Sequence, residues 1–207
     1  MDEPFQCNKR LIMLREKLKE HTIILASASP RRHQFFKDMG LSFEVRLKSI
    51  EEVYPSQLKG AEISDYLAKL KAEAFINELN SKDILITSDT VVWHQEESLA
   101  KAATSSEAEK MLKKLSGDWH QVITSVCFTT IERQTVLNSI TKVKFKDLSL
   151  GEIQYYIENF KPYDKAGAYG IQEWIGLIGI EEINGSYTNV VGLPTQLVYK
   201  TLSSMIN

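Results

Sequence analysis

A turn of hydroxyl and guanidinium side chains near the start of the chain has the residue types of a phosphate-binding site. Ser27 opens this turn directly after the apolar run 23–26, and Arg31 and Arg32 close it. Pro30 favours the first turn of a helix, because proline lacks the N–H group that has no helical partner there. Helix N-termini attract anions, and arginine forks match phosphate oxygens. The turn therefore predicts a phosphate site, with a serine cap and two solvated arginines as the alternative.

Two acidic positions are candidates for proton transfer or for binding a cation. Asp89 stands in the apolar stretch 84–92, where a carboxylate is costly unless it is paired or binds a cation. The alternative is an aspartate that caps a turn at the end of a strand. Glu51 and Glu52 stand in an expected loop. Carboxylates there can hold a divalent cation through oxygen, although adjacent acids in a loop are more often plain surface.

A glycine-rich segment later in the chain is a candidate for recognising a nucleobase. The segment 163–172 holds two glycines, which permit close approach of the backbone to a ligand. Gln172 carries both a donor and an acceptor and can read the edge of a base. Tyr163 and Tyr169 can stack on a base, or they can pack at the rim of an ordinary glycine turn. A second glycine-punctuated segment, 185–194, is read as a loop that leads into the last helix, and the sequence favours a scaffold role for it.

These residues need elements that position them, and the sequence predicts alternating helices and strands. Helices are expected at 8–20, 30–39, 62–80, 104–116, 148–160 and 194–206, and strands at 23–26, 42–47, 83–92, 120–131, 134–146 and 173–182. Gly40 is placed to close the second helix, and Thr104 with Glu107 resembles a capping box. Such alternation, with a hairpin added late, predicts an α/β domain around a mixed sheet.

Composition excludes several classes of protein. The 207 residues are 43% hydrophobic, enough for one large domain or two small lobes, and the net charge is −2. Without a basic excess, no stable nucleic-acid partner is expected. The two cysteines, Cys7 and Cys127, form neither a disulfide framework nor a zinc site, so a cytoplasmic location is expected. No apolar run approaches the ~20 residues that span a membrane, and no signal peptide is predicted.

Common catalytic motifs are also missing from the sequence. The four histidines show no metal-ligand spacing, and neither a Gly-x-Ser-x-Gly elbow nor a P-loop is present. Cys127 stands in a hydrophobic strand and is expected to be an inert core residue. A serine or cysteine hydrolase is therefore not expected.

Six motifs occur in an order that resembles the Maf family of nucleoside triphosphate pyrophosphatases. They stand at 27–32, 67–72, 88–92, 115–124, 165–172 and 185–194. The resemblance covers about residues 22–203, so residues 1–21 are expected to be an N-terminal helical extension and residues 22–207 a Maf-like domain. It implies an elongated α/β fold with two lobes around a mixed sheet and flanking helices, similar to the inosine triphosphate pyrophosphatases. It also implies a homodimer.

The resemblance assigns roles to individual residues. Members of the family split a nucleoside triphosphate between its α- and β-phosphates. By resemblance Asp89 is the proton acceptor, and Mg²⁺ or Mn²⁺ is held by Asp89 and by one of two adjacent glutamates, Glu51 or Glu52, of which spacing favours Glu52. The positions matching the triphosphate and metal site are Ser27, Arg32, Glu52, Lys71 and Lys101.

Residues tied to substrate choice indicate one branch of the family. The pair Asp89-Thr90 and the segment 168–172 resemble the branch that acts on dTTP and UTP, in which Arg31, Thr90 and Gln172 occupy positions tied to substrate choice. The amide of Gln172 matches the acceptor and donor on the edge of uracil or thymine. The chain departs from the family pattern at three positions: Ala100 and Ala102 flank Lys101, and Glu173 replaces a glycine.

Three alternatives stay open at this point. One is a non-catalytic nucleotide-binding regulator of cell division, against which the retained acids and basic motif residues argue. Another is an RNA-binding protein, which the acidic pI of about 6.1 disfavours. The third is the same chemistry on another base, such as that of inosine triphosphate or 7-methyl-GTP. The family resemblance implies a house-cleaning role in which modified pyrimidine nucleotides are removed.

Overall fold

A single mixed sheet forms the centre of the protein in a computed structural model, which describes residues 14–206. The strands are β1 (Thr22–Leu25), β2 (Glu44–Val45), β3 (Asp83–His94), β4 (Glu97–Leu99), β5 (Trp119–Thr129), β6 (Gln134–Phe145) and β7 (Ile180–Asn184). They lie in the order β2-β1-β3-β5-β6-β7, with β4 paired to β3. The pairs β2-β1 and β1-β3 are parallel and the others are antiparallel, which confirms the prediction of a mixed sheet.

Helices cover this sheet on both sides and at its ends. They are α2 (Pro30–Asp38), α3 (Ala61–Glu73), α4 (Ser105–Leu115), α5 (Leu150–Phe160), α6 (Trp174–Gly179), α7 (Tyr187–Val191) and α8 (Thr195–Met205), with short 3₁₀ helices η1 (Leu18–Glu20) and η2 (Ile76–Glu78). Polar caps begin several of them. Thr104 Oγ1 accepts from Glu107 N, but the Glu107 carboxylate accepts from Ala103 N, one residue before the expected partner. Ser149 forms a complete capping box with Glu152.

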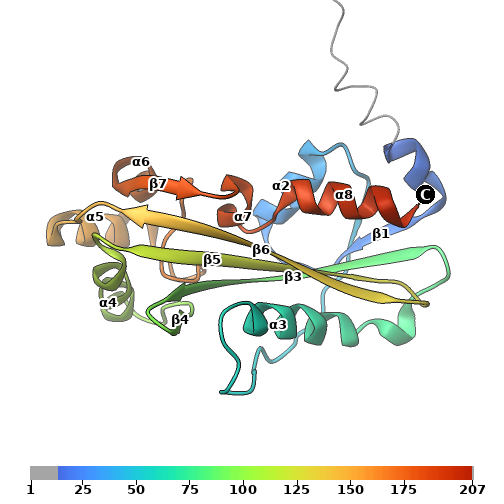
Figure 1. The fold of residues 1–207 in the computed structure, drawn as a ribbon, viewed down its shortest axis with the longest axis horizontal. Coiled ribbons are helices and arrows are strands. Elements are labelled where there is room, and N and C mark those ends of the chain that lie inside the picture. Colours follow the sequence, from blue (N-terminus) through green and yellow to red (C-terminus); the bar gives the residue numbers. More distant parts are fainter. Residues whose placement is uncertain (1–13, 207) are drawn as a thin grey trace, which may run out of the picture.

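The molecule is elongated and has two lobes joined by the long strands β3, β5 and β6 (Figure 1). In the first, the α2–α8 lobe, buried Phe36, Phe128 and Leu202 belong to one core cluster. In the second, the α4–α5 lobe, Leu112 and Tyr156 belong to another. Because β3 and β5 are buried on both faces where they cross between the lobes, they hold the two cores in a fixed relation.

Three expectations about the elements were wrong in part. The helix expected at 62–80 ends at Glu73, and η2 follows it. The strand expected at 173–182 is instead α6 followed by β7, because a short apolar run does not distinguish a helix from a strand by periodicity. Gly176 sits so close to Ile171 that an added Cβ would lie 1.8 Å from its carbonyl oxygen. The segment 185–194, read as a loop, contains the short helix α7.

Strand β4 was not expected at all. It returns along β3 through a tight turn at Gln95 and Glu96, which have φ of 46° and 62°. A two-residue hairpin turn with positive φ usually carries Asn or Gly, so these residues give no recognisable turn signal. The short β4 matters because it ends two residues before Lys101.

The predicted N-terminal helix lies partly outside the described residues, since residues 1–13 are not described. Residues 14–17 are helical and lead into η1. Leu14 and Leu18 are buried in the core of the α2–α8 lobe. The described part of the extension therefore packs on the chain's own domain.

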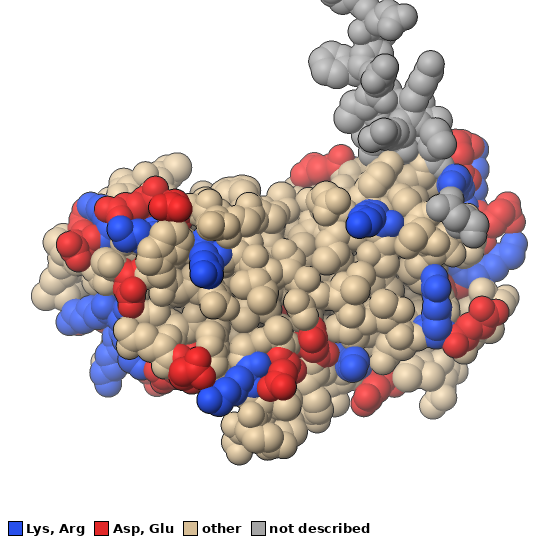
Figure 2. All heavy atoms as spheres, viewed as in Figure 1, with Lys and Arg blue, Asp and Glu red and all other residues tan. Residues whose placement is uncertain are grey.

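Charged side chains of both signs are interspersed on the face seen in Figure 2. They lie at the two ends of the molecule and along the lower edge of this view, and much of the centre of the face is uncharged. Within residues 14–206, no helix is both long enough and apolar enough to cross a membrane.

Candidate active site

A cavity of about 900 Å³ opens beside the middle of β3, and all nine residues expected at the site line it. Its walls come from the β1–α2 turn, the segment before α3, α3, β3, the end of β4 and the segments 164–172 and 190–192. Glu51 does not line the cavity and Glu52 does, which favours Glu52 among the two adjacent acids. The residues brought together are Ser27, Arg31, Arg32, Glu52, Lys71, Asp89, Thr90, Lys101 and Gln172.

The β1–α2 turn is ordered by hydrogen bonds of its own. Ser29 caps α2 by accepting from Arg32 N, and Ser27 Oγ accepts from Ser29 N at 3.2 Å. His33 Nε2 lies 2.6 Å from the carbonyl oxygen of Ser27. The N-terminus of α2 therefore faces the cavity in a fixed geometry, which is the arrangement that binds anions.

Arg32 is bound by the protein itself. Its Nε donates to the carbonyl of Gly192 at 2.8 Å, Nη1 to the carbonyl of Ser88 at 2.8 Å, and Nη2 to Thr90 Oγ1 at 3.1 Å. Nη1 also contacts Ser27 Oγ at 3.4 Å. Burial lowers the pKa of the guanidinium, and nearby Asp89 opposes this shift. Arg32 thus ties the β1–α2 turn to β3 and to the end of α7, with few N–H groups left for a ligand.

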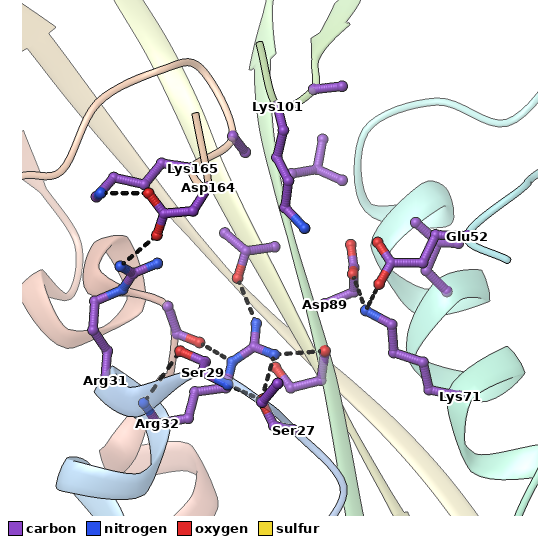
Figure 3. Close-up of a pocket in the computed structure, with 18 of the residues that line it drawn as sticks. Ser27, Ser29, Arg31, Arg32, Glu52, Lys71, Asp89, Lys101, Asp164 and Lys165 are labelled. Atoms are coloured by element: carbon purple, nitrogen blue, oxygen red, sulfur yellow. Dashed lines mark hydrogen bonds and ion pairs between the residues drawn. The ribbon is translucent and has the colours of Figure 1, made fainter. Parts of the chain in front are cut away.

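Lys71 lies between two carboxylates on the floor of the cavity (Figure 3). Its Nζ is 2.9 Å from Glu52 Oε1 and 2.6 Å from Asp89 Oδ1. Burial raises the pKa of Asp89 even though Lys71 opposes the shift. Glu52 is half-buried and burial acts on it in the same sense, but Lys71 and Lys101 together lower its pKa. The two acids therefore have pKa values pushed in opposite directions.

The second oxygen of Asp89 has no protein donor within residues 14–206, since only Lys71 bonds this carboxylate. The carboxylate comes from the middle of β3, where the polar residues 87–90 stand between the apolar runs 84–86 and 91–93. A buried carboxylate with an unused oxygen is able to accept a hydrogen bond from a water or a ligand.

The donor set suits a divalent cation that is completed by a substrate. No group of three His, Cys, Asp or Glu side chains converges anywhere in the described part of the chain. Glu52 and Asp89 nevertheless meet at one cation, the ammonium of Lys71. Mg²⁺ is commonly bound by one or two carboxylates with substrate phosphates and water supplying the rest, so these two acids fit that pattern.

Lys101 extends into the cavity from the end of β4 (Figure 3). It is exposed, and in the stretch from residue 14 to 206 it makes no ion pair. A β-bridge to Ala166 holds its backbone. The alanines that flank it therefore leave its charge directed into the cavity.

A second group of charges lies at the opposite wall. Arg31 contacts Asp164 Oδ2 at 3.4 Å, and Lys165 Nζ lies 2.6 Å from Asp164 Oδ1 and 3.0 Å from Glu173 Oε1. Glu173 does not line the cavity, so its added negative charge points toward Lys165 instead of toward a ligand.

Tyr169, one of the two tyrosines considered for stacking on a base, lines the cavity. Its side chain is buried, its hydroxyl bonds His120 Nε2 at 2.7 Å, and its ring packs edge-on against Phe145. Tyr163 packs against the core of the α4–α5 lobe and does not line the cavity. Tyr163 therefore supports the wall from behind, whereas Tyr169 is a buried part of the wall itself.

Sequence reasoning missed a polar network behind Thr90. Thr90 Oγ1 lies 3.0 Å from Thr124 Oγ1, which donates to the carbonyl of Asn189 at 3.1 Å. The Asn189 amide donates to Thr141 Oγ1 at 2.9 Å. This network crosses three strands and anchors α7, so the segment 185–194 is a scaffold for the site wall. Single threonines in strands carry no signal that would have revealed it.

Comparison with known proteins gives a consistent family. The family model described as "Maf-like protein" matches residues 22–205. A protein of Flavobacterium johnsoniae named "dTTP/UTP pyrophosphatase" is 58% identical over 194 residues, covering 94% of this chain and all of the relative. Proteins of the same name from Christiangramia forsetii and Phocaeicola vulgatus are 55% and 48% identical, covering 94% and 92% of this chain and 100% and 99% of the relatives.

A solved structure shares the fold at low sequence identity. The Ham1 protein of Staphylococcus aureus superposes with a TM-score of 0.50 at 17% identity, covering 89% of this chain and 99% of that one. The expected likeness to this class of fold is thereby confirmed.

Proposed function

The chain belongs to the Maf-like protein family, and from this premise we propose that it is a nucleoside triphosphate pyrophosphatase that acts on dTTP and UTP. The reaction hydrolyses the anhydride between the α- and β-phosphates and yields a nucleoside monophosphate and pyrophosphate. The names of the relatives support the substrates, and the cavity supports the chemistry.

The observation that carries the proposal is the pair of acids around Lys71. Asp89 has a pKa raised by burial, and Glu52 has a pKa lowered chiefly by Lys71 against the effect of its own burial. Neighbouring acids whose environments push their pKa values apart are typical of sites with one proton acceptor and one permanently charged group. Asp89 is the proposed proton acceptor, and Glu52 stays ionised.

Asp89 takes a proton from the attacking water at its unused oxygen. The water oxygen forms a bond to phosphorus, the phosphoanhydride bond breaks, and pyrophosphate leaves as an anion. Lys71 and Lys101 stabilise the charge that develops on the phosphate oxygens. Arg32 holds the β1–α2 turn, including Ser27, in position to receive the phosphates. Glu52 and Asp89 would hold Mg²⁺ or Mn²⁺, which neutralises phosphate charge when bound.

Gln172 is the proposed reader of the base. It lines the cavity, it is exposed, and its amide makes no hydrogen bond to any other residue between 14 and 206. A free amide offers an acceptor beside a donor, the complement of the O4 and N3–H edge of uracil or thymine. Thr90 and Arg31 flank the same cavity and complete the proposed specificity positions.

The proposal extends to the setting of the enzyme. A cytoplasmic location and a homodimer follow from the sequence expectations, and removal of modified pyrimidine nucleotides is the proposed role. Light scattering of the purified protein measures its mass against that of the 23.6 kDa chain.

A panel of triphosphates tests the function. The purified protein is incubated with UTP, dTTP, CTP, ITP, GTP and 7-methyl-GTP, each with Mg²⁺, Mn²⁺ or EDTA. Monophosphate and pyrophosphate are separated from inorganic phosphate by chromatography. We expect UMP or dTMP with equimolar pyrophosphate, dependent on the metal. Release of single phosphates, or no release from either pyrimidine substrate, would overturn the proposal.

A further inference from the structure

We propose that Glu173 is a positioning residue that fixes the reach of Gln172 and so sets the preference for pyrimidine over purine triphosphates. This inference rests on the proposed function, because it assigns base reading to Gln172. Glu173 itself lies outside the cavity wall, directly behind the residue that faces the ligand.

Both oxygens of the Glu173 carboxylate are bonded, one to Lys165 in the segment that carries Gln172 and the other to Tyr156 in α5. Oε1 lies 3.0 Å from Lys165 Nζ, and Oε2 accepts a short hydrogen bond from the hydroxyl of Tyr156. Tyr156 is fully buried in α5 and is therefore a rigid anchor in the α4–α5 lobe. The carboxylate thus links the segment that carries Gln172 to helix α5.

The same tyrosine hydroxyl closes a turn around Gln172. It accepts from Gly170 N at 3.0 Å, and Glu173 N donates to the carbonyl of Gly170 at 2.9 Å. Gln172 therefore stands on a turn whose two ends meet at Tyr156. A Cβ at Gly170 would lie 2.8 Å from Glu173 Cδ and 3.0 Å from Lys165 Cε, so the Glu173 and Lys165 side chains fill this space. These contacts hold the backbone of Gln172 on the side away from the cavity.

The reach of Gln172 matters because two kinds of base share one hydrogen-bonding edge. Uracil presents O4 beside N3–H, and hypoxanthine presents O6 beside N1–H, so a glutamine amide reads both equally well. The purine edge lies farther from the ribose because its ring system is larger. The position of the Gln172 backbone, and not the chemistry of its amide, then separates UTP from ITP.

Positive and negative side chains are balanced at this wall. Loss of Glu173 is therefore expected to affect recognition of the base more than binding of the phosphates. Lys165 is paired with Asp164 as well as with Glu173, and it is only 9% exposed. Removing the Glu173 carboxylate leaves Lys165 with one partner and leaves the acids around Lys71 untouched.

The test measures kcat/KM for UTP and for ITP in a set of single variants. Glu173→Gly removes both contacts, Tyr156→Phe removes the anchor, and Glu173→Gln keeps an acceptor for Tyr156 while it loses the ion pair. We expect the UTP-to-ITP ratio to fall about tenfold in the first two, equivalent to one lost hydrogen bond, and less in the third. Glu158→Gln, an exposed acid on α5, is the matched control and should leave the ratio unchanged.

A double variant shows whether Glu173 acts through Gln172. Gln172→Ala alone should lower the ratio, and adding Glu173→Gly should lower it no further, because residues in one chain of contacts are not additive. Additive effects, or an unchanged ratio in both Glu173 variants that fold by circular dichroism, would overturn the inference. A wild-type protein without pyrophosphate release from UTP would instead overturn the proposed function itself.

Discussion

Two lysines of this cleft are each paired with two carboxylates, yet the two triads do different work. Lys71 lies between Glu52 and Asp89, and Lys165 lies between Asp164 and Glu173. In the second triad both oxygens of Glu173 are bonded. In the first, one oxygen of Asp89 has no protein donor within residues 14–206.

Hydrogen-bond saturation, more than the types of residue present, thus distinguishes the proposed proton acceptor from a structural acid. Burial raises the pKa of Asp89 while leaving it an oxygen with which to accept a proton. Both carboxylate oxygens of Glu173 are bonded, one to Lys165 and the other to the Tyr156 hydroxyl. Burial and this contact raise the pKa of Tyr156. The same residue types therefore serve architecture at the Lys165 triad and, in the proposed function, chemistry at the Lys71 triad.

The largest effect is expected from removing the reactive acid. Asp89→Asn should lower turnover by about 10²–10⁴-fold, because the amide cannot accept the proton of the attacking water. Pyrophosphate release from UTP measures turnover, and calorimetric titration with a non-hydrolysable analogue should show that triphosphate binding is retained. Glu132→Gln, at the exposed tip of the β5–β6 hairpin, is the control. Near-wild-type release by Asp89→Asn would remove Asp89 from the proposed role.

The second-largest effect is expected from removing the charge of Lys101. Lys101→Met should lower kcat/KM by about 10²-fold, because a preorganised charge aimed at the phosphates is lost. Its free energy of unfolding should change by less than about 0.5 kcal/mol, since Lys101 is exposed and has no ion pair to lose in the described residues. Steady-state kinetics and urea unfolding measure the two quantities. An activity loss matched by an equal loss of stability would show that Lys101 is structural.

Arg32 is expected to show the opposite pattern, a larger effect on stability, because its guanidinium N–H groups are bonded by the protein itself. Arg32→Lys should lower the free energy of unfolding by about 2 kcal/mol, since an ammonium cannot replace a fork that bonds Gly192, Ser88 and Thr90. Arg31→Lys loses only an exposed pair and should cost less than about 1 kcal/mol. Urea unfolding of both variants makes the comparison. Equal costs would mean that the Arg32 bonds add no net stability.

How far these distinctions could be predicted differs between the two triads. The acids and lysines of the Lys71 triad stand in motifs, and the apolar neighbours of Asp89 in β3 mark it as a costly carboxylate. The Lys165 triad depends on Tyr156, a residue of α5 that reads as an ordinary core aromatic. Its contact with Glu173 exists only because α5 packs beneath the segment 164–173, which no local pattern reveals.

The same limit applies to the fold. Long strands such as β3 and β5, and the Thr104 cap of α4, follow from local patterns and were predicted. The segment that begins at Trp174 was misread because tertiary contacts decide it. Gly176 permits close approach to Ile171, and the apolar side chains there fit a helical turn as well as a strand.

The pH dependence of activity should show the environment of Asp89. The raised pKa means that the acid limb of kcat/KM lies above the ordinary aspartate value of about 3.9, with a tenfold loss per unit below it. The folded protein holds this proton more tightly than the unfolded chain. Protonation of Asp89 therefore favours folding, and this contribution is lost as pH rises through the folded pKa.

Because protonation of Asp89 stabilises the fold, loss of activity through this titration can be distinguished from loss of activity through acid unfolding. Activity should fall on the acid side while circular dichroism still reports a folded protein, and the residual activity of Asp89→Asn should lack this limb. A limb that coincides with unfolding, or that persists in Asp89→Asn, would assign it to another group.

The smallest effect is expected at the Lys165 triad. Asp164→Asn removes a negative charge from the cavity wall, frees Arg31 from its 3.4 Å contact and leaves Lys165 paired with Glu173. The Asp164 side chain is 61% exposed, so screening keeps the effect small. We expect KM for UTP to fall about threefold at low salt, kcat to stay near the wild-type value, and the KM difference to shrink in 0.5 M KCl. A large fall in kcat would place Asp164 with Asp89 among the reactive acids and would erase the contrast between the two triads.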